Sequence, residues 1–287
     1  MGFGRYRFRR SFGNVGSTFR GARPDTYPLY TGVLDSYPGA AAAYSLRALS
    51  RGWLAGDVVE VRSSAGGDPA SFTASQVANG TLEAWVGVGN DGFVTTWYDQ
   101  SGNANDATQI ATASQPKIVD AGALVTGGLD FDGVDDELDF DSAIDFSNGD
   151  WLLSAVFKWD GSISPIVGGA AVQWSLQVAT AVNFSARATN DSVIHNFTPS
   201  TNFASGTVAL ASIYRSSDVL YGSKDGTEVL ANPAITSGDT FSADRIGRRG
   251  AAFNSSPIAE IIIYNTDQYA NRAGIETNIN DHYSIYA

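Results

Sequence analysis

Short apolar runs recur along the chain after residue 90, and each is bounded by Gly, Asn, Asp or Ser. Apolar runs of about four to eight residues between such turn-forming residues predict β-strands. A Lys-Asp-Gly-Thr sequence at 224–227 predicts a tight hairpin between two of these strands. We predict strands at 123–125, 129–131, 138–140, 151–159, 166–167, 172–178, 183–188, 208–214, 219–224, 227–230, 244–246 and 257–264. Many short strands with almost no helix between them indicate an all-β sandwich or jelly roll.

Two further strands are predicted nearer the N-terminus. Val58, Val59 and Val61 form a β-branched apolar run. In residues 93–98 both faces of the predicted strand carry bulky side chains, which indicates an inner strand covered on both sides. Its two faces are Phe93, Thr95 and Trp97, and Val94, Thr96 and Tyr98.

Three segments have the pattern of helices. Alanines at 40–43, with Tyr44, Leu46 and Leu49 partly on one side, predict a short helix over 40–49. A second short helix is predicted at 82–86, with Thr81 as its N-cap. At the C-terminus, helical spacing predicts an amphipathic helix on the edge of the sandwich, with Thr266 as its N-cap. Its apolar positions and neighbours are Tyr269, Arg272, Ile275, Ile279 and Tyr283.

The composition narrows the class of protein. Hydrophobic residues make up 43% of the 287 residues and charged residues 17%, so a large core is covered mainly by uncharged polar side chains, as is common in extracellular and particle-bound β-proteins. The absence of cysteine excludes a disulfide scaffold, a thiolate zinc site and a cysteine nucleophile. The chain has only two histidines, His195 and His282, which disfavours a multi-histidine metal site. No apolar run reaches the roughly 18 residues of a membrane span, so we expect no membrane partner.

The charge is divided unevenly along the chain. The net charge is -12, but six arginines against Asp25 give residues 1–30 a charge of +5, which leaves -17 for the rest. We interpret residues 1–38 as a basic Arg/aromatic arm that docks on a partner. Its candidate docking residues are Arg5, Arg7, Phe8, Arg9, Arg10, Phe12 and Arg20. Binding of nucleic acid through phosphate contacts and stacking is the alternative, and it is disfavoured because the body is too acidic to help hold a polyanion.

Two polar stretches are candidates for a cation. In "WYDQSGNANDATQ", residues 97–109, Asp99, Ser101, Asn103 and Asn105 alternate like the first ligands of an EF-hand, but Ala104 and Ile110 stand where that pattern needs Gly and Glu. An ordered turn whose side chains satisfy backbone groups is therefore preferred there. The acidic run is the better candidate for a structural calcium ion, through Asp130, Asp132, Asp135 and Asp136. The alternative is a hairpin whose aspartates cap their own backbone amides.

A sugar site would combine aromatic rings with amides and carboxylates. The six tryptophans lie mostly in strand-like segments and are predicted to be core, so a glycan site is expected in the polar loops, with its residues unassigned. There is no Gly-x-Ser-x-Gly elbow, P-loop or His-Glu-x-x-His motif. Arg245, Arg248 and Arg249 form a small basic patch, for which surface ion pairs are the favoured interpretation.

Two resemblances are carried by specific segments. "IAEIIIYNTDQYANRAGIETNINDHYSI" resembles the C-terminal signature of concanavalin A-like (laminin-G-like) jelly-roll domains, and "LDFDGVDDELDFD" resembles the early hairpin of the same superfamily. Residues 41–115, with "AAYSLRALS" and "WYDQSGNANDATQ", are similar to the N-terminal part of the α-L-arabinofuranosidase B catalytic domain. They also resemble many phage virion proteins that carry the same two motifs. The resemblances imply a single concanavalin A-like sandwich over residues 39–287.

The sequence lacks the catalytic motif of the furanosidase family that it resembles. That family places its nucleophilic Glu within Gly-Asn-Ala-Glu, which does not occur here. The glutamates of the second half, Glu137, Glu228, Glu260 and Glu276, suggest no carboxylate pair of the kind a retaining glycosidase needs. The resemblance therefore implies fold rather than catalysis, and we predict no enzymatic activity.

The combined interpretation is a phage virion structural protein, such as a decoration, fibre or spike protein. Its arm would bind other virion proteins of the capsid or tail, and its body would bind host-surface polysaccharide. A homo-oligomer fits such a role, and the expected location is the surface of the virion. Two alternatives stay open: a glycoside hydrolase of the arabinofuranosidase type, and a capsid or tail cement protein without a ligand.

Overall fold

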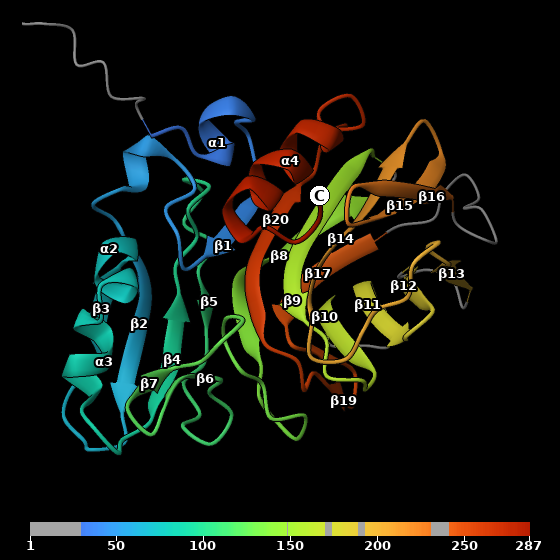
Figure 1. The fold of residues 1–287 in the computed structure, drawn as a ribbon. Helices are drawn as coiled ribbons and strands as arrows, with labels where there is room; N and C mark the ends of the chain where they lie inside the picture. Colours follow the sequence, from blue (N-terminus) through green and yellow to red (C-terminus); the bar gives the residue numbers. More distant parts are fainter. Residues whose placement is uncertain (1–29, 148, 170–173, 189–192, 231–240) are drawn as a thin grey trace, which may run out of the picture. The chain divides into compact units, whose positions relative to one another are not determined.

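The computed structural model describes residues 30–147, 149–169, 174–188, 193–230 and 241–287. The chain divides into two units, Met1–Tyr30 and Thr31–Ala287, and the second contains two large antiparallel sheets (Figure 1). The predicted arm residues Arg5 to Arg20 lie outside the described residues. The predicted all-β sandwich with short helices and a C-terminal helix is confirmed.

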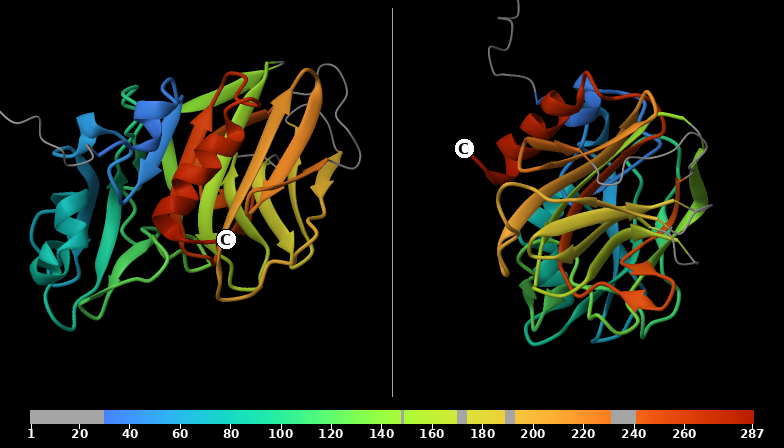
Figure 2. Two further views of the ribbon diagram at one scale, coloured as in Figure 1. Left: turned by 45° about the horizontal axis from the view of Figure 1, so that its top comes forward. Right: turned by 90° about the vertical axis from the view of Figure 1, so that its right-hand side faces the viewer.

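The smaller sheet has six strands, and the C-terminal helix packs on its outer face. The strand order is β1 (Ala42–Ser45), β20 (Ile258–Tyr264), β9 (Trp151–Lys158), β14 (Val208–Ser216), β15 (Val219–Lys224) and β16 (Thr227–Leu230). The helix is α4 (Arg272–Tyr283), which lies across these strands beside α1 (Val33–Ser36) (Figure 2). Since β1 is 215 residues away from its partner β20 in sequence, this sheet joins the two ends of the unit.

The larger sheet forms the opposite layer. Its strand order is β13 (Ile194–Phe197), β12 (Asn183–Arg187), β11 (Trp174–Thr180), β10 (Ser164–Gly168), β17 (Phe241–Ile246), β8 (Leu138–Ser147), β5 (Ala107–Thr108), β4 (Gly92–Trp97), β2 (Asp57–Ser63) and β3 (Ala70–Thr73). β6 (Lys117–Asp120) and β7 (Ala123–Leu124) branch from β4, and β18 (Arg248–Arg249) pairs separately with β19 (Ala252–Phe253). The remaining helices are η1 (Arg51–Trp53), α2 (Ala74–Ala78) and α3 (Thr81–Val86).

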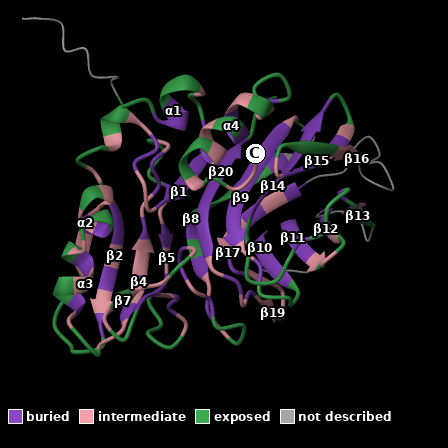
Figure 3. Ribbon diagram, viewed as in Figure 1, coloured by how far each residue is buried: buried purple, intermediate pink, exposed green. Residues whose placement is uncertain are grey.

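Two apolar layers hold the unit together (Figure 3). The main core lies between the two sheets and contains the fully buried rings of Trp97 and Trp151. A second layer joins the outer face of the six-stranded sheet to the helices through Val33, Ile275 and Ile279. Burial of most tryptophans was predicted and is confirmed for Trp97, Trp151 and Trp159, whereas Trp85 on α3 is 37% exposed. In the described part of the chain, no helix has the length and apolar character needed to cross a membrane.

Four local predictions are wrong. Residues 40–49 contain β1 instead of a helix, because all four residues of Ala42–Ser45 are buried against β20, and this packing overrides the helical preference of alanine. Residues 129–131 form only isolated bridges, Lys117 to Asp130 and Leu129 to Ile258. Thr81 is not the N-cap of α3 but its first residue, and Gly80 is the N-cap. Thr266 is not the N-cap of α4 either, because the helix begins at Arg272 and its N-cap is Asn271.

The two faces predicted for residues 93–98 are also wrong. Thr96 pairs with Glu60, whereas Val94 pairs with Val61, so Thr95 is an extra residue in β4. Such a β-bulge shifts the alternation by one residue. Val94 and Trp97 consequently both lie in the core, at 0% exposure, although simple alternation separates them.

Candidate functional site

The polar turn after β4 is organised by the buried carboxylate of Asp99. Its Oδ1 accepts hydrogen bonds from the backbone N–H groups of Ala43 at 2.8 Å and Ser101 at 2.9 Å. Its Oδ2 accepts from the Ser101 hydroxyl at 2.6 Å and from the Asn105 backbone N–H at 3.1 Å. One carboxylate thus joins the turn to β1, which is the architectural role predicted for this segment.

Gln100 closes the free edge of β1. Its backbone N–H donates to Ala43 O at 2.8 Å, and its Nε2 donates to Ser45 O and Arg47 O, each at 2.9 Å. Its Oε1 accepts from the backbone N–H of Leu49 at 2.8 Å. The side chain is 3% exposed, so these backbone groups are satisfied without water. Pairing of this kind is what an edge strand needs to avoid unwanted pairing with another chain.

The two asparagines of the turn connect it to both sheets. Asn103 donates from Nδ2 to Ala40 O at 2.9 Å and Ala41 O at 3.1 Å, on the segment that leads into β1. Asn105 exchanges two hydrogen bonds with the backbone of Ser142 on β8, at 2.8 and 2.9 Å. The turn therefore fixes the distance between the start of β1 and the middle of β8.

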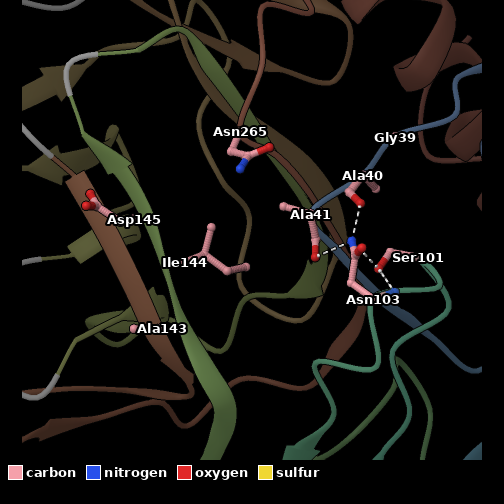
Figure 4. Close-up of a pocket in the computed structure, with 9 residues that line it drawn as sticks. All are labelled: Gly39, Ala40, Ala41, Ser101, Asn103, Ala143, Ile144, Asp145 and Asn265. Carbon is pink, nitrogen blue, oxygen red and sulfur yellow. Dashed lines mark hydrogen bonds between the residues drawn. The ribbon is translucent and has the colours of Figure 1, made fainter.

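A groove opens where the turn separates β1 from β8. Its volume is about 490 Å³, and Gly39, Ala40 and Ala41 form one wall while β8 forms another (Figure 4). On β8, Ile144 points toward Ala41 and the turn, whereas Asp145 lies on the other side of the strand (Figure 4). The complete lining is Gly39, Ala40, Ala41, Ser101, Asn103, Ala143, Ile144, Asp145 and Asn265.

The groove exists because β8 extends beyond the end of its neighbour β5. β8 pairs with β17 as far as Ser147, but with β5 only at Asp139 and Phe140. Small residues at 39–41 keep the opposite wall low, and the exposed amide of Asn265 projects from the chain just after β20 (Figure 4). Hydroxyl and amide groups thus line a cavity within the size range of small-molecule sites.

The acidic run forms a self-capped turn, not the predicted hairpin, because Leu129 and Asp130 bridge to Ile258 and Lys117 while β8 pairs with β5 and β17. Asp132 Oδ1 accepts backbone hydrogen bonds from Val134 at 2.8 Å and Asp135 at 3.1 Å, and Asp136 Oδ2 accepts from the Asp132 N–H at 3.0 Å. This is the capping predicted as the alternative to a cation. Burial, together with the negative charge of Asp132, raises the pKa of Asp136 to about 7.

Three of the four predicted calcium ligands do lie together. One carboxylate oxygen from each of Asp132, Asp135 and Asp136 lies within 4.8 Å of the others. Asp130 is outside this group; burial raises the pKa of its carboxyl group. A cation at the three clustered carboxylates stays a prediction, since their hydrogen bonds also explain the arrangement without one.

Comparison with solved structures gives the fold a precedent. A structure of GH54 α-L-arabinofuranosidase soaked with a cyclic sulfate inhibitor aligns with a TM-score of 0.56 at 12% identity, over 86% of this chain and 64% of that one. The chain has the sandwich fold of these arabinofuranosidase structures. A GH54 mutant soaked with 4-nitrophenyl α-L-arabinofuranoside (TM-score 0.55) and an arabinofuranosidase complexed with arabinofuranosyl-α-1,2-xylobiose (0.51) align over the same shares at the same identity.

The likeness to these arabinofuranosidases is one of fold. The chain spans about two thirds of their length, at 64%. At 12% identity, residue roles do not transfer from them. The sequence matches no protein-family model and no curated protein.

Each of the four candidate glutamates has a partner within the structure. Glu260 is 1% exposed on β20 and pairs with Arg47 at 2.7 Å, and Glu276 pairs with Arg272 at 2.6 Å. Glu228 accepts a hydrogen bond from Tyr214 at 2.5 Å. Glu137 binds two members of the predicted basic patch, Arg245 at 2.9 Å and Arg248 at 2.7 Å, as the ion-pair interpretation of that patch predicted.

Proposed function

We propose that this chain is a glycan-binding protein of a phage virion, which holds saccharide in the groove between β1, the 97–109 turn and β8. The observation that carries the proposal is the groove itself. It is open and walled by small residues, and the amide oxygen of Asn103 and the whole amide of Asn265 line it, whereas the Ser101 hydroxyl and Asn103 Nδ2 are bonded within the turn. Neutral hydroxyl and amide groups that both donate and accept suit the hydroxyls of a sugar.

Binding is favoured over hydrolysis by the arrangement of carboxylates. Among the described residues that line the groove, Asp145 is the single carboxylate, and it lies on the side of β8 away from Ile144 (Figure 4). A retaining glycosidase uses two carboxyl groups about 5 Å apart, and an inverting one uses two about 6.5–9.5 Å apart. The fold likeness to arabinofuranosidases keeps hydrolysis as the second candidate, and release of arabinose from arabinan tests it.

The location on a virion is supported by the charge of the sequence. Residues 1–30 carry six arginines and one aspartate, whereas the body is strongly acidic. A basic arm on an acidic body suits attachment to an acidic or apolar partner surface, and it directs the body outward from that surface. The motifs shared with phage virion proteins point the same way.

The groove can be tested with one exposed residue. Asn265 lines the groove, and Asn202 is an exposed asparagine that does not. On an array of bacterial surface polysaccharides and arabinan, we expect the wild type and the Asn202→Ala and Asn202→Trp controls to bind the same glycans. Asn265→Ala loses the hydrogen bonds of one amide, about 1–1.5 kcal/mol, so the affinity falls about tenfold. Asn265→Trp fills the groove and abolishes binding.

Two results contradict the proposal. One is the absence of binding by the wild type to every polysaccharide on the array. The other is binding by Asn265→Trp with the affinity of the wild type, which places the sugar elsewhere. Calorimetry at equal ionic strength gives the affinities for both comparisons.

A further inference from the structure

Three tyrosines gather on the outer face of the six-stranded sheet, and none of them lines the groove. Tyr214 on β14 and Tyr221 on β15 are directly opposite each other, and their rings stack at 5.3 Å with an angle of 8° between their planes. Tyr269, in the segment before α4, lies 5.1 Å from Tyr221 and 6.0 Å from Tyr214, tilted by about 50° to each. We call these three rings the tyrosine platform.

Contacts with Glu228, Arg272 and Asp267 hold the platform in place. Tyr214 is 1% exposed, its hydroxyl donates to Glu228 Oε2 at 2.5 Å, and the Arg272 guanidinium lies 5.7 Å from the centre of its ring. Arg272 in turn pairs with Glu276 of α4 at 2.6 Å. Tyr269 is placed by a hydrogen bond from its backbone N–H to Asp267 Oδ1 at 2.9 Å. Rings held in this way lose little conformational entropy when a ligand binds.

The upper side of the platform meets solvent. Tyr269 is 44% exposed, and Tyr221 is partly exposed. Leu230 on β16, directly opposite Tyr221, is 63% exposed and extends the apolar surface across a third strand. The Glu228 side chain is 33% exposed, and both of its contacts, with Tyr214 and Arg272, use Oε2. The partly exposed rings of Tyr221 and Tyr269 and the exposed side chain of Leu230 thus lie beside one oriented carboxylate.

We propose that the tyrosine platform is a second saccharide-binding site, for a neutral oligosaccharide of pyranose rings. A pyranose has an apolar C–H face and a rim of hydroxyls, and tyrosine offers an apolar face with a polar tip. Glu228 can accept hydrogen bonds from two hydroxyls of such a ring, since an ionised carboxylate is a strong acceptor. The site is separate from the groove, because none of Tyr221, Glu228, Leu230 and Tyr269 is among the residues that line the groove.

Two other occupants fit the platform less well. A cationic ligand would meet Arg272, which already lies over Tyr214 as the cation of this cluster. A second copy of the chain needs about 800 Å² and 20–30 residues on each side for a stable interface, far more than the four exposed or partly exposed residues Tyr221, Glu228, Leu230 and Tyr269. An anionic polysaccharide is disfavoured by Glu228 and by the net charge of -12.

Saturation-transfer NMR with the full chain tests the site. The probes are cellohexaose, maltohexaose and a mannan hexasaccharide, with oligogalacturonate as the anionic contrast. We expect at least one neutral probe to bind and oligogalacturonate to bind at least about threefold more weakly, by like-charge repulsion. Tyr269→Ala should weaken the binding about tenfold and Tyr269→Phe by less than about threefold, because the ring supplies the stacking. Glu228→Gln should weaken it about three- to tenfold, because a charged acceptor becomes neutral.

The controls separate this site from the groove and from loss of folding. Trp85→Ala removes an aromatic of similar exposure, 37%, from α3 and should leave the platform's affinity unchanged. Asn265→Trp blocks the groove and should leave it unchanged as well. Circular dichroism and melting temperature show whether each variant is folded, and Tyr269→Phe provides a near-isosteric variant.

Four results overturn the inference. Saturation transfer from none of the neutral probes is one, and undiminished binding by Tyr269→Ala is another. The third is concentration-dependent self-association of the wild type that Tyr269→Ala abolishes, which assigns the platform to contact between copies. The fourth is loss of binding in Asn265→Trp but not in Tyr269→Ala, which assigns the saccharide to the groove and excludes the platform as its site.

Discussion

Asp136 shows how a single residue of the acidic turn couples folding to pH. It lies beside Asp132 and Asp135, is 6% exposed, and accepts the Asp132 backbone N–H through Oδ2. Its pKa rises from 3.8 to about 7, chiefly because burial disfavours the charged form. Between these two values the folded protein keeps a proton that the unfolded chain has lost. The contribution to stability is therefore complete below about pH 4 and is lost as the pH rises toward 7.

Asp136→Asn should remove this dependence while it keeps the hydrogen bond, because the amide oxygen can accept from Asp132. We expect the variant and the wild type to have similar free energies of unfolding near pH 4, and the variant to be the more stable at pH 8. Urea unfolding across this range measures the difference. Asp68→Asn, at an exposed site on the turn between β2 and β3, is the matched control. Parallel curves for Asp136→Asn and the wild type contradict the assignment.

At the scale of elements, the pattern of apolar runs predicts most strands, but it does not predict which strands pair or in which register. Residues 40–49 have helical composition, yet β1 forms there because its edge is completed from 56 residues away, by Asp99. The bulge at Thr95 likewise depends on the register with β2, which no local pattern encodes. For the same reason the polar turn was identifiable as ordered, but the groove beside it was not, since Asn265 and β8 come from distant segments.

Gln100 provides the test of the edge closure. Gln100→Ala removes the partner of the buried groups Leu49 N and Ser45 O and of the part-buried Arg47 O. Each unsatisfied buried group costs about 1–3 kcal/mol, so we expect a loss of roughly 3 kcal/mol or more in the free energy of unfolding. Gln76→Ala is the comparison, because Gln76 also binds backbone, but at the N-terminus of α2, where a cap is worth about 1 kcal/mol. Equal losses in the two variants, measured by urea unfolding, contradict the edge-closing role.

The helix α4 is held by charge as well as by apolar contact. Glu276 is 1% exposed and lies between Arg272 and the hydroxyl of Ser223 on β15. Burial raises the pKa of its carboxyl group, while Arg272 acts in the opposite direction. The terminal helix was predictable from its spacing, but this buried pair was not, because spacing does not show which polar residue faces the sheet.

At the scale of the whole molecule, the sequence divides into a basic start and an acidic body. The structural unit begins at Thr31, and Val33 and Leu34 of α1 are buried in its second apolar layer. The backbone of Leu34 also donates to Leu49 O at 2.9 Å. These residues therefore belong to the body in terms of stability, even though the sequence pattern joins them to the arm.

Two truncations separate attachment from folding. A chain that starts at Tyr30 should melt within about 2 °C of the full chain, because it keeps the whole of the unit Thr31–Ala287. A chain that starts at Gly39 loses the burial of Val33 and Leu34, about 4 kcal/mol, and should melt roughly 10 °C lower. Both should fail to assemble onto the virion, as measured by their presence in purified particles. Normal incorporation of the chain that starts at Tyr30 contradicts the docking role of the arm.

The central claim is that saccharide lies in the groove between β1, the turn and β8. The most direct measurement is a map of backbone amide chemical shifts as the tightest glycan from the array is added. The Tyr269→Ala variant is the right sample, because it weakens binding at the platform about tenfold and so favours the groove. We predict the largest shifts at Gly39 to Ala41, Ser101 to Asn103, Ala143 to Asp145 and Asn265. Shifts confined to other residues, or none at saturating glycan, contradict the account.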